Sequence, residues 1–285
     1  MKNKKLIIAV LAAVAVLAVI IAAVCISVSI GNSTKSLEKA GVSHEDIALV
    51  SHRGFSHLAP ENTLEAAQKA AENGYNHIEF DIRRTKDGIW VLMHDSDIKR
   101  TTNGEGKVNE LTYKQILSCR IDEGNGVDDY ELITVPTLKE MLSLCSQLNL
   151  RPVIEIKESG TEHTLELLHE IALYRNSDFD IISFNKEQIE AIDSILKQGR
   201  TTIYRSNVGI YILVKEFDKE TLDFSKVNPD IGISFSCKAN NIEKNVKALQ
   251  EAGVPLAVWT VNKPKQLKEL YDLGIRTFTT DKITP

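Results

Sequence analysis

Residues 255–280, PLAVWTVNKPKQLKELYDLGIRTFTT, contain two expected strands with a helix between them. Apolar residues fill 255–261, helical spacing runs over 264–273 and stops at Gly274, and 276–280 is again extended in character. A strand, a helix and a second strand in this order predict two parallel strands, because the helix returns the chain to the same end of the sheet.

The same alternation runs through most of the chain. The expected strands are 47–51, 77–83, 152–156, 179–184, 202–205, 231–236, 255–261 and 276–280. The helices expected between them are 62–73, 137–148, 164–174, 186–197, 242–252 and 264–273. Eight such units predict an α/β fold, a closed (β/α)8 TIM barrel. An open doubly wound sheet is the alternative, but no glycine-rich phosphate loop follows the first strand. Residues 96–135 interrupt the pattern and predict a small insertion after strand 2.

The composition is that of an ordinary globular protein. Of 285 residues, 43% are hydrophobic and 26% are charged, and the net charge is −5. These values do not fit a disordered chain. The acidic balance also argues against a nucleic-acid partner, which a basic protein would bind.

The N-terminal segment is different in character. Residues 6–30 contain no charged side chain, and all three preceding lysines lie within residues 1–5. A helix of this length reaches about 37 Å, enough to cross a hydrocarbon core of about 30 Å. We therefore expect a transmembrane helix at 6–30, a cytoplasmic basic stub at 1–5 and a linker at 31–46.

The basic stub also predicts the orientation. The barrel at 47–285 is expected outside the cytoplasm, as the catalytic domain of a single-pass protein of the cell membrane. A cleaved signal peptide is the competing interpretation of the same segment, although its apolar core is usually shorter.

Acidic residues gather where the active site of such a barrel lies, at the C-terminal ends of the strands. Glu79 and Asp81 are two residues apart, so both side chains point to one face of a strand, and Glu155 and Lys157 do the same. Three converging carboxylates predict a bound cation, and oxygen ligands favour Ca²⁺ or Mg²⁺. The alternative is a set of ion pairs, such as Glu79 with Arg83 and Glu155 with Lys157.

Two histidines and an arginine accompany these carboxylates. His52 ends the first strand and His94 ends the short extended piece at 89–93. Histidine titrates near neutral pH, so the two could supply a base and an acid. Arg53 offers a planar, permanently charged group for a phosphate oxygen, although a salt bridge to a ligand carboxylate is a competing role. A hard cation with these side chains and Lys157 predicts phosphoryl transfer.

Eight ordered motifs resemble the glycerophosphodiester phosphodiesterase family from about Val50 to the C-terminus. They are SHRG (51–54), APENT (59–63), IEFD (78–81), VLMHD (91–95), RTTNG (100–104), VPTL (135–138), IEIK (154–157) and VWTVN (258–262). The resemblance implies a (β/α)8 barrel with a small insertion. By position it implies metal ligands Glu79, Asp81 and Glu155, an acid–base pair His52 and His94, phosphate contacts Arg53 and Lys157, a possible accessory residue Glu61 near the metal, and an aromatic wall Trp259 beside the glycerol.

The resemblance thus implies a metal-dependent enzyme that hydrolyses a small-molecule glycerophosphodiester to an alcohol and glycerol 3-phosphate. Two alternatives stay open: a lysophospholipase D-type or glycerol-phosphate polymer hydrolase, and a non-catalytic phosphodiester-binding barrel. The sequence does not choose between Ca²⁺ and Mg²⁺ or assign an oligomeric state. Arg276 and Thr277 stand where the family usually has aspartate and glycine, which concerns the rim near strand eight and the choice of substrate.

Overall fold

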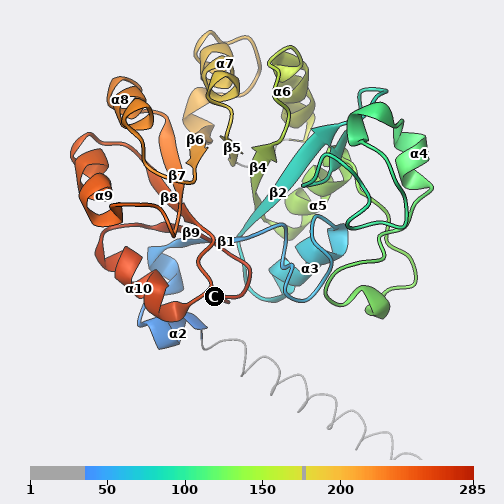
Figure 1. Ribbon diagram of the computed structural model, residues 1–285, viewed down its shortest axis with the longest axis horizontal. Coiled ribbons are helices and arrows are strands. Elements are labelled where there is room, and N and C mark those ends of the chain that lie inside the picture. The colour runs from blue at the N-terminus through green and yellow to red at the C-terminus, as the bar shows by residue number, and fades with distance from the viewer. Residues whose placement is uncertain (1–35, 175–177) are drawn as a thin grey trace, which may run out of the picture.

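The computed structural model describes residues 36–174 and 178–285, and its centre is a closed barrel of parallel strands (Figure 1). The strands, in spatial order, are β1 (Ala48–Ser51), β9 (Thr277–Thr280), β8 (Leu256–Trp259), β7 (Gly232–Ser236), β6 (Val208–Val214), β5 (Phe179–Ser183), β4 (Arg151–Ile156) and β2 (His77–Arg84). β1 pairs with both β9 and β2, which closes the sheet. The prediction of a (β/α)8 TIM barrel is confirmed. A short strand, β3 (Trp90–Leu92), adds to β2 in the antiparallel direction.

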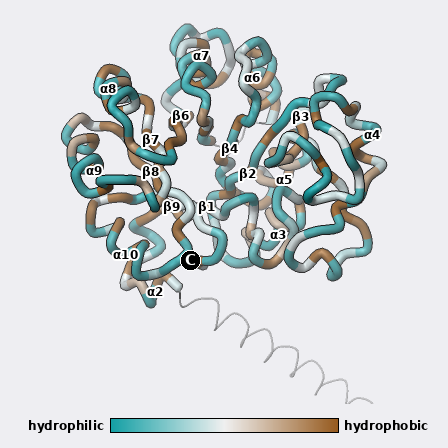
Figure 2. The backbone as a smooth tube through the Cα atoms, viewed as in Figure 1, coloured by the Kyte–Doolittle hydropathy of each residue, from teal (hydrophilic) through white to brown (hydrophobic). Residues whose placement is uncertain are grey.

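Helices surround these strands (Figure 1). They are α3 (Leu64–Glu72), α5 (Leu138–Leu148), α6 (Thr164–Leu173), α7 (Lys186–Lys197), α8 (Lys219–Val227), α9 (Ile242–Glu251) and α10 (Pro264–Asp272). Hydrophilic and hydrophobic residues alternate along the outer helices, as Figure 2 shows, because each helix buries one side against the strands. Inside the barrel, Val50, Val153, Ile182 and Leu213 form a small apolar cluster beneath the strand ends.

The prediction of a strand at 202–205 is wrong. Residues 205–207 form a short 3-10 helix, and β6 follows at Val208–Val214. The Arg205 side chain holds this turn in place, because it donates to Asp193 Oδ1 at 2.7 Å and to the Val208 carbonyl at 2.8 Å. The nearly continuous apolar run at residues 208–214, VGIYILV, is typical of a strand that is buried on both faces.

The helix α8 was also missed. Its sequence, KETLDFSKV, buries Thr221, Phe224 and Ser225, so the apolar pattern on its inner face is weak. The start signal is clear in the structure, where the Asp218 side chain accepts a hydrogen bond from the Thr221 backbone N–H at 2.7 Å.

The expected linker at 31–46 differs from the structure over the part that is described. Ser36–Ala40 is a helix, α2, and His44–Asp46 is a 3-10 helix. Leu37, Ala40 and Val42 are buried in the same apolar cluster as Leu270 of α10, so these residues belong to the barrel domain. Their apolar side chains are scattered among polar ones, which hid this packing in the sequence.

The expected transmembrane helix at 6–30 lies outside the described residues. Within the described ranges, the structure contains no helix long and apolar enough to span a bilayer.

The segment between β3 and α5 packs around a core of its own, at the side of the barrel next to α3 and α5 (Figure 1). It contains 3-10 helices at Val108–Glu110 and Val127–Asp129 and the short helix α4 (Tyr113–Leu117). This segment also touches the loop after β1, since Asn125 Nδ2 donates to the Ser56 carbonyl at 2.8 Å. The insertion therefore braces a loop that carries residues of the candidate site.

Candidate active site

The three predicted metal ligands lie together at the C-terminal ends of neighbouring strands. Glu79 and Asp81 come from β2 and Glu155 from β4, and Asp81 is directly opposite Glu155 in the strand register. One carboxylate oxygen from each residue lies within 4.8 Å of the others. The exposed fractions are 1% for Glu79, 0% for Asp81 and 7% for Glu155, so the acidic cluster is almost completely buried.

Two residues of the loop after β1 orient these carboxylates. The Arg53 backbone N–H donates to Glu79 Oε2 at 2.8 Å. The Asn62 side chain donates to Asp81 Oδ2 at 2.8 Å and accepts from the Asp81 backbone N–H at 3.0 Å. Arg53 and Asn62 both have positive φ, 55° and 58°. The same loop also requires Gly54, where a Cβ atom would lie 2.6 Å from Ala66 Cβ.

The free oxygen atoms in this cluster fit a divalent cation. Glu79 Oε1 is buried and has no hydrogen-bond partner among the described residues. A buried carboxylate oxygen without a partner is costly, and a hard cation would satisfy it. Carboxylates are the ligands of Ca²⁺ and Mg²⁺, so Glu79, Asp81 and Glu155 are the residues that would hold either ion.

The pKa values of the three carboxyl groups also indicate that this cluster requires nearby positive charge. Burial and the nearby Asp81 charge raise the pKa of Glu79 to about 8. Burial and Asp81 likewise raise the pKa of Glu155 to about 7. Burial works in the same direction on Asp81, but the charges of Lys157 and Arg53 outweigh it and lower its pKa to about 2. The cluster thus resists carrying three negative charges without a cation.

Lys157 and Arg53 supply part of the missing positive charge. Lys157 Nζ lies 2.5 Å from Glu155 Oε1 and 3.0 Å from Asp81 Oδ1. Arg53 Nε lies 3.4 Å from Asp81 Oδ2. Both cations line the pocket, so each can contact a phosphate placed over the carboxylates.

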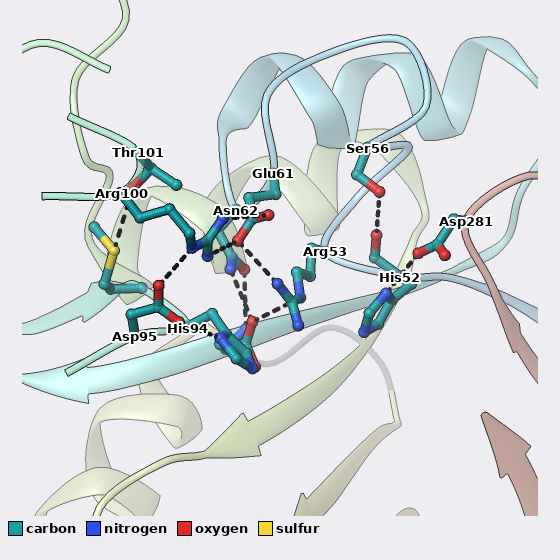
Figure 3. Close-up of polar contacts among 12 residues, drawn as sticks. His52, Arg53, Ser56, Glu61, Asn62, His94, Asp95, Arg100, Thr101 and Asp281 are labelled. Carbon is teal, nitrogen blue, oxygen red and sulfur yellow. Dashed lines mark hydrogen bonds and ion pairs between the residues drawn. The ribbon is translucent and has the colours of Figure 1, made fainter. Parts of the chain in front are cut away.

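His52 is held by a carboxylate from the end of β9. Its Nδ1 lies 2.7 Å from Asp281 Oδ1 (Figure 3). Asn262 Nδ2 donates to the other oxygen, Asp281 Oδ2, at 2.6 Å. The other ring nitrogen, Nε2, lies 3.9 Å from Glu79 Oε2. Burial lowers the pKa of His52, but the hydrogen bond to Asp281 and the charge of Glu79 outweigh it and leave the pKa above its usual value.

His94 has a similar arrangement on the opposite side of Arg53 (Figure 3). Its Nδ1 lies 2.6 Å from Asp95 Oδ1. Burial is the largest effect on His94 and places its pKa below the usual value. Its carbonyl oxygen accepts from Arg83 Nη2 at 2.8 Å, so Arg83 holds His94 rather than pairing with Glu79. Of the two ion pairs considered from the sequence, the one between Glu155 and Lys157 is therefore formed. Within the described residues, Glu79 forms none with Arg83, which instead lies 3.9 Å from Glu158 Oε1.

Glu61 lies outside the acidic cluster. Its Oε1 accepts from Arg53 Nη1 at 2.9 Å and from Arg100 Nη2 at 2.7 Å, and Arg100 Nε also lies 2.5 Å from Asp95 Oδ2 (Figure 3). The structure thus places Glu61 between two arginines, where it positions Arg53. An unbroken chain of charged groups therefore runs from Arg53 through Glu61 and Arg100 to Asp95, the carboxylate that holds His94.

Four residues of this site were not singled out as site residues from the sequence: Asn62, Asp95, Arg100 and Asp281. All of the first three stand inside the quoted motifs; Asn62 is next to Glu61 and Asp95 is next to His94, whereas Arg100 begins the motif RTTNG, which contains no predicted site residue. Asp281 was noticed only as the end of the last strand, and its contact with His52 joins positions 229 residues apart. Closure of the barrel brings these two ends together.

A cavity of about 570 Å³ opens above the acidic cluster. One side is polar and carries the histidines, Arg53 and Lys157, and the other is formed by Ile182, Phe184, Leu213 and Trp259. The Trp259 and Phe184 rings meet edge to face, with centroids 5.7 Å apart. Trp259 Nε1 donates to the Ser234 carbonyl at 3.0 Å, which fixes the indole in the wall.

Comparison with known proteins agrees with this geometry. The chain is 40% identical over 136 residues to human glycerophosphodiester phosphodiesterase 1, a match that covers 46% of this chain and 41% of that protein. It is 28% identical over 245 residues to a glycerophosphodiester phosphodiesterase of Bacillus altitudinis, covering 82% of this chain and 94% of the relative. The human match therefore spans less than half of that relative's length.

Solved structures share the fold. A phosphodiesterase of Oleispira antarctica in complex with the product sn-glycerol-3-phosphate superposes with a TM-score of 0.72 at 21% identity, covering 82% of this chain and 93% of that one. A glycerophosphodiester phosphodiesterase of Thermotoga maritima gives 0.64 at 25% identity, covering 85% and 97%. The sequence profile of the glycerophosphoryl diester phosphodiesterase family matches residues 52–284, most of the chain and all of the site. The chain belongs to the glycerophosphoryl diester phosphodiesterase family.

Proposed function

We propose that this protein hydrolyses glycerophosphodiesters to an alcohol and glycerol 3-phosphate in a reaction that needs a divalent cation. One observation carries the proposal: three buried carboxylates lie between two histidines, each with its Nδ1 held by an aspartate, at the floor of one pocket. Family membership and the glycerol-3-phosphate product bound by the Oleispira relative support the same reaction.

Each side chain has a role that follows from its position. A bound Ca²⁺ or Mg²⁺ ion, held by Glu79, Asp81 and Glu155, would supply positive charge next to the phosphate oxygens. Arg53 and Lys157 bind the same phosphate and keep it in the pocket.

The two histidines move the protons. Because Asp281 and Asp95 occupy the Nδ1 atoms, His52 and His94 both present Nε2 to the substrate. One imidazole withdraws a proton from the nucleophile, and the other protonates the departing alcohol. The nucleophile is either water or the neighbouring hydroxyl of the glycerol. We favour the hydroxyl, which releases the alcohol and forms a cyclic phosphate. A water molecule then breaks one P–O bond of the ring to give glycerol 3-phosphate, and a quenched reaction would reveal the cyclic intermediate.

We also propose that residues 6–30 anchor the protein in the cell membrane with the barrel outside the cytoplasm. The proposal rests on the uncharged run and the lysines before it. Membrane fractions washed with alkaline carbonate should retain the protein, and mass spectrometry should find Lys4 and Lys5 on it. Recovery of a chain that begins after residue 22 would show a cleaved signal instead.

The activity is tested with the full-length chain in detergent. EDTA-treated protein is assayed for glycerol 3-phosphate release from a mixture of glycerophosphodiesters, without metal and with Ca²⁺ or Mg²⁺. Release that returns with metal supports the proposal and identifies the ion. Choline release from micellar lysophosphatidylcholine without glycerophosphodiester cleavage would favour the lysophospholipase D alternative. Tight ligand binding without any product would indicate a non-catalytic barrel.

A further inference from the structure

A positive charge lies in the pocket away from the acidic cluster. Lys215 directly follows β6, and its side chain lines the same cavity as Glu155. β5 separates β6 from β4, which carries Glu155. At about 4.8 Å between neighbouring strands, β6 and β4 are about 10 Å apart. A substrate whose phosphate lies over Glu155 can therefore extend a second group toward Lys215.

Lys215 is not neutralised as the other cations of the pocket are. Arg53 and Lys157 each lie within ion-pair distance of buried carboxylates. Lys215 is exposed and forms no ion pair within the described part of the chain. The acidic residue next to it, Glu216, instead accepts a hydrogen bond from the Asn240 backbone N–H at 2.6 Å. The ammonium group is thus available to an anion of the substrate.

The aromatic wall makes the same part of the pocket unsuitable for a cationic group. Lys215 Nζ lies 5.8 Å from the centroid of the Phe184 ring, which packs edge to face on Trp259. Aromatic faces bind quaternary ammonium groups through their negative potential. Here a cation already occupies the Phe184 face, so a choline group would meet a like charge.

We propose that Lys215 is a specificity-determining residue that selects glycerophosphodiesters whose alcohol carries an anionic group, either a carboxylate or a second phosphate. The inference rests on the proposed phosphodiesterase activity. The glycerol of such a substrate has no charge, so an anion that meets Lys215 has to belong to the alcohol. Substrates with neutral or cationic alcohols lack this contact.

The test compares kcat/KM within two matched pairs of substrates, using the full-length chain in detergent with saturating metal. Glycerophosphoserine differs from glycerophosphoethanolamine by one carboxylate. Bis(glycerophospho)glycerol differs from glycerophosphoglycerol by one glycerophosphate unit and is corrected for its two equivalent ends. We expect the native chain to have a kcat/KM about fivefold higher for the anionic member of at least one pair, because this is the largest preference that one partly exposed ion pair usually provides. The pair that shows the preference identifies the anion.

Substitutions then assign the preference to the side chain. Lys215→Met should remove it, Lys215→Glu should reverse it, and about 0.5 M NaCl should weaken it in the native chain, since salt screens exposed charges. Lys186→Met is the matched control, because Lys186 also lies over an aromatic ring, Phe224 at 4.7 Å, but does not line the pocket.

The outcomes separate this inference from the activity. A native enzyme that prefers neither anionic substrate, or a preference that survives Lys215→Met, overturns the role of Lys215 and leaves the phosphodiesterase activity standing. Failure to hydrolyse any of the four substrates with either metal overturns the activity, and the inference with it.

Discussion

His52 Nδ1 and Asp281 Oδ1 lie 2.7 Å apart, across the seam where β1 and β9 close the barrel. The aspartate accepts the Nδ1 proton, so the lone pair or proton on Nε2 faces the pocket. It also accepts from Asn262, which prevents its rotation away from the histidine. The seam of the barrel therefore sets the tautomer of His52, one of the two histidines to which we assign proton transfer.

We predict that Asp281→Asn lowers kcat about a hundredfold, within the range for general acid–base catalysis, and changes KM little. Asp281 raises the pKa of His52, so its removal should move the His52 titration to lower pH. The pH profile of kcat and NMR titration of the imidazole measure both effects. Asp272→Asn is the control, since among the described residues Asp272 forms an ion pair only with Lys268, on the surface. An unchanged His52 titration would contradict the role of Asp281.

Each of the two histidines should be needed for full turnover. His52→Ala and His94→Ala should each lower turnover about a hundredfold or more, because each removes one proton-transfer group. Metal affinity should change little in comparison, which calorimetric titration with Ca²⁺ or Mg²⁺ will measure. His169→Ala, an exposed histidine on α6, serves as the control. A His94→Ala enzyme with native turnover would refute the acid–base assignment.

The sequence was sufficient to predict the barrel and the convergence of Glu79, Asp81 and Glu155, because both depend on local patterns. The two-residue spacing along a strand places Glu79 and Asp81 on one face, and alternating strands and helices leave few topologies. Features that depend on distant contacts were missed. The turn at Arg205 is fixed by Asp193, and the strand predicted at 202–205 lies instead at Val208–Val214. Asp281 joins His52 only after the barrel closes, and no pattern near either residue indicates that contact.

The buried carboxylates of the acidic cluster should make the thermal stability of the protein depend on both pH and bound metal. The pKa of Glu79 is about 8 in the metal-free fold, above the usual 4.5. A raised carboxyl pKa gives stability that is complete below pH 4.5 and is lost as the pH rises through 8. We therefore expect the Tm of EDTA-treated protein to fall over this interval, and the Tm gain on adding Ca²⁺ or Mg²⁺ to grow. Differential scanning calorimetry in the two states measures this.

Glu79→Gln separates this effect from general acid or alkaline denaturation. The amide cannot ionise, so the metal-free variant should lose much of the decline in Tm, and its metal affinity should fall about tenfold or more, as expected when a ligand is removed. Glu166→Gln changes an exposed carboxylate that pairs with Arg84 and should behave as the native protein. A metal-dependent Tm gain that is equal at pH 5 and pH 8 would contradict the placement of the cation.

Arg100 connects the insertion to the candidate active site. Its guanidinium lies 2.7 Å from Glu61 Oε1 and 2.5 Å from Asp95 Oδ2, so one side chain holds the partner of Arg53 and the partner of His94. We expect Arg100→Met to lower kcat about tenfold while Tm changes little, because its exposed ion pairs contribute little stability.

A lysine at position 100 distinguishes a positioning role of Arg100 from one that needs only its positive charge. Arg100→Lys should restore only part of the rate, since an ammonium group cannot reproduce the planar fork that reaches both carboxylates. Lys99→Met is the matched control, because the neighbouring Lys99 pairs with Glu105 at 2.8 Å on the surface. Steady-state kinetics and the pH profile of kcat provide the readout. If Arg100→Met keeps the native kcat and pH profile, the insertion braces the fold without positioning His94 or Arg53.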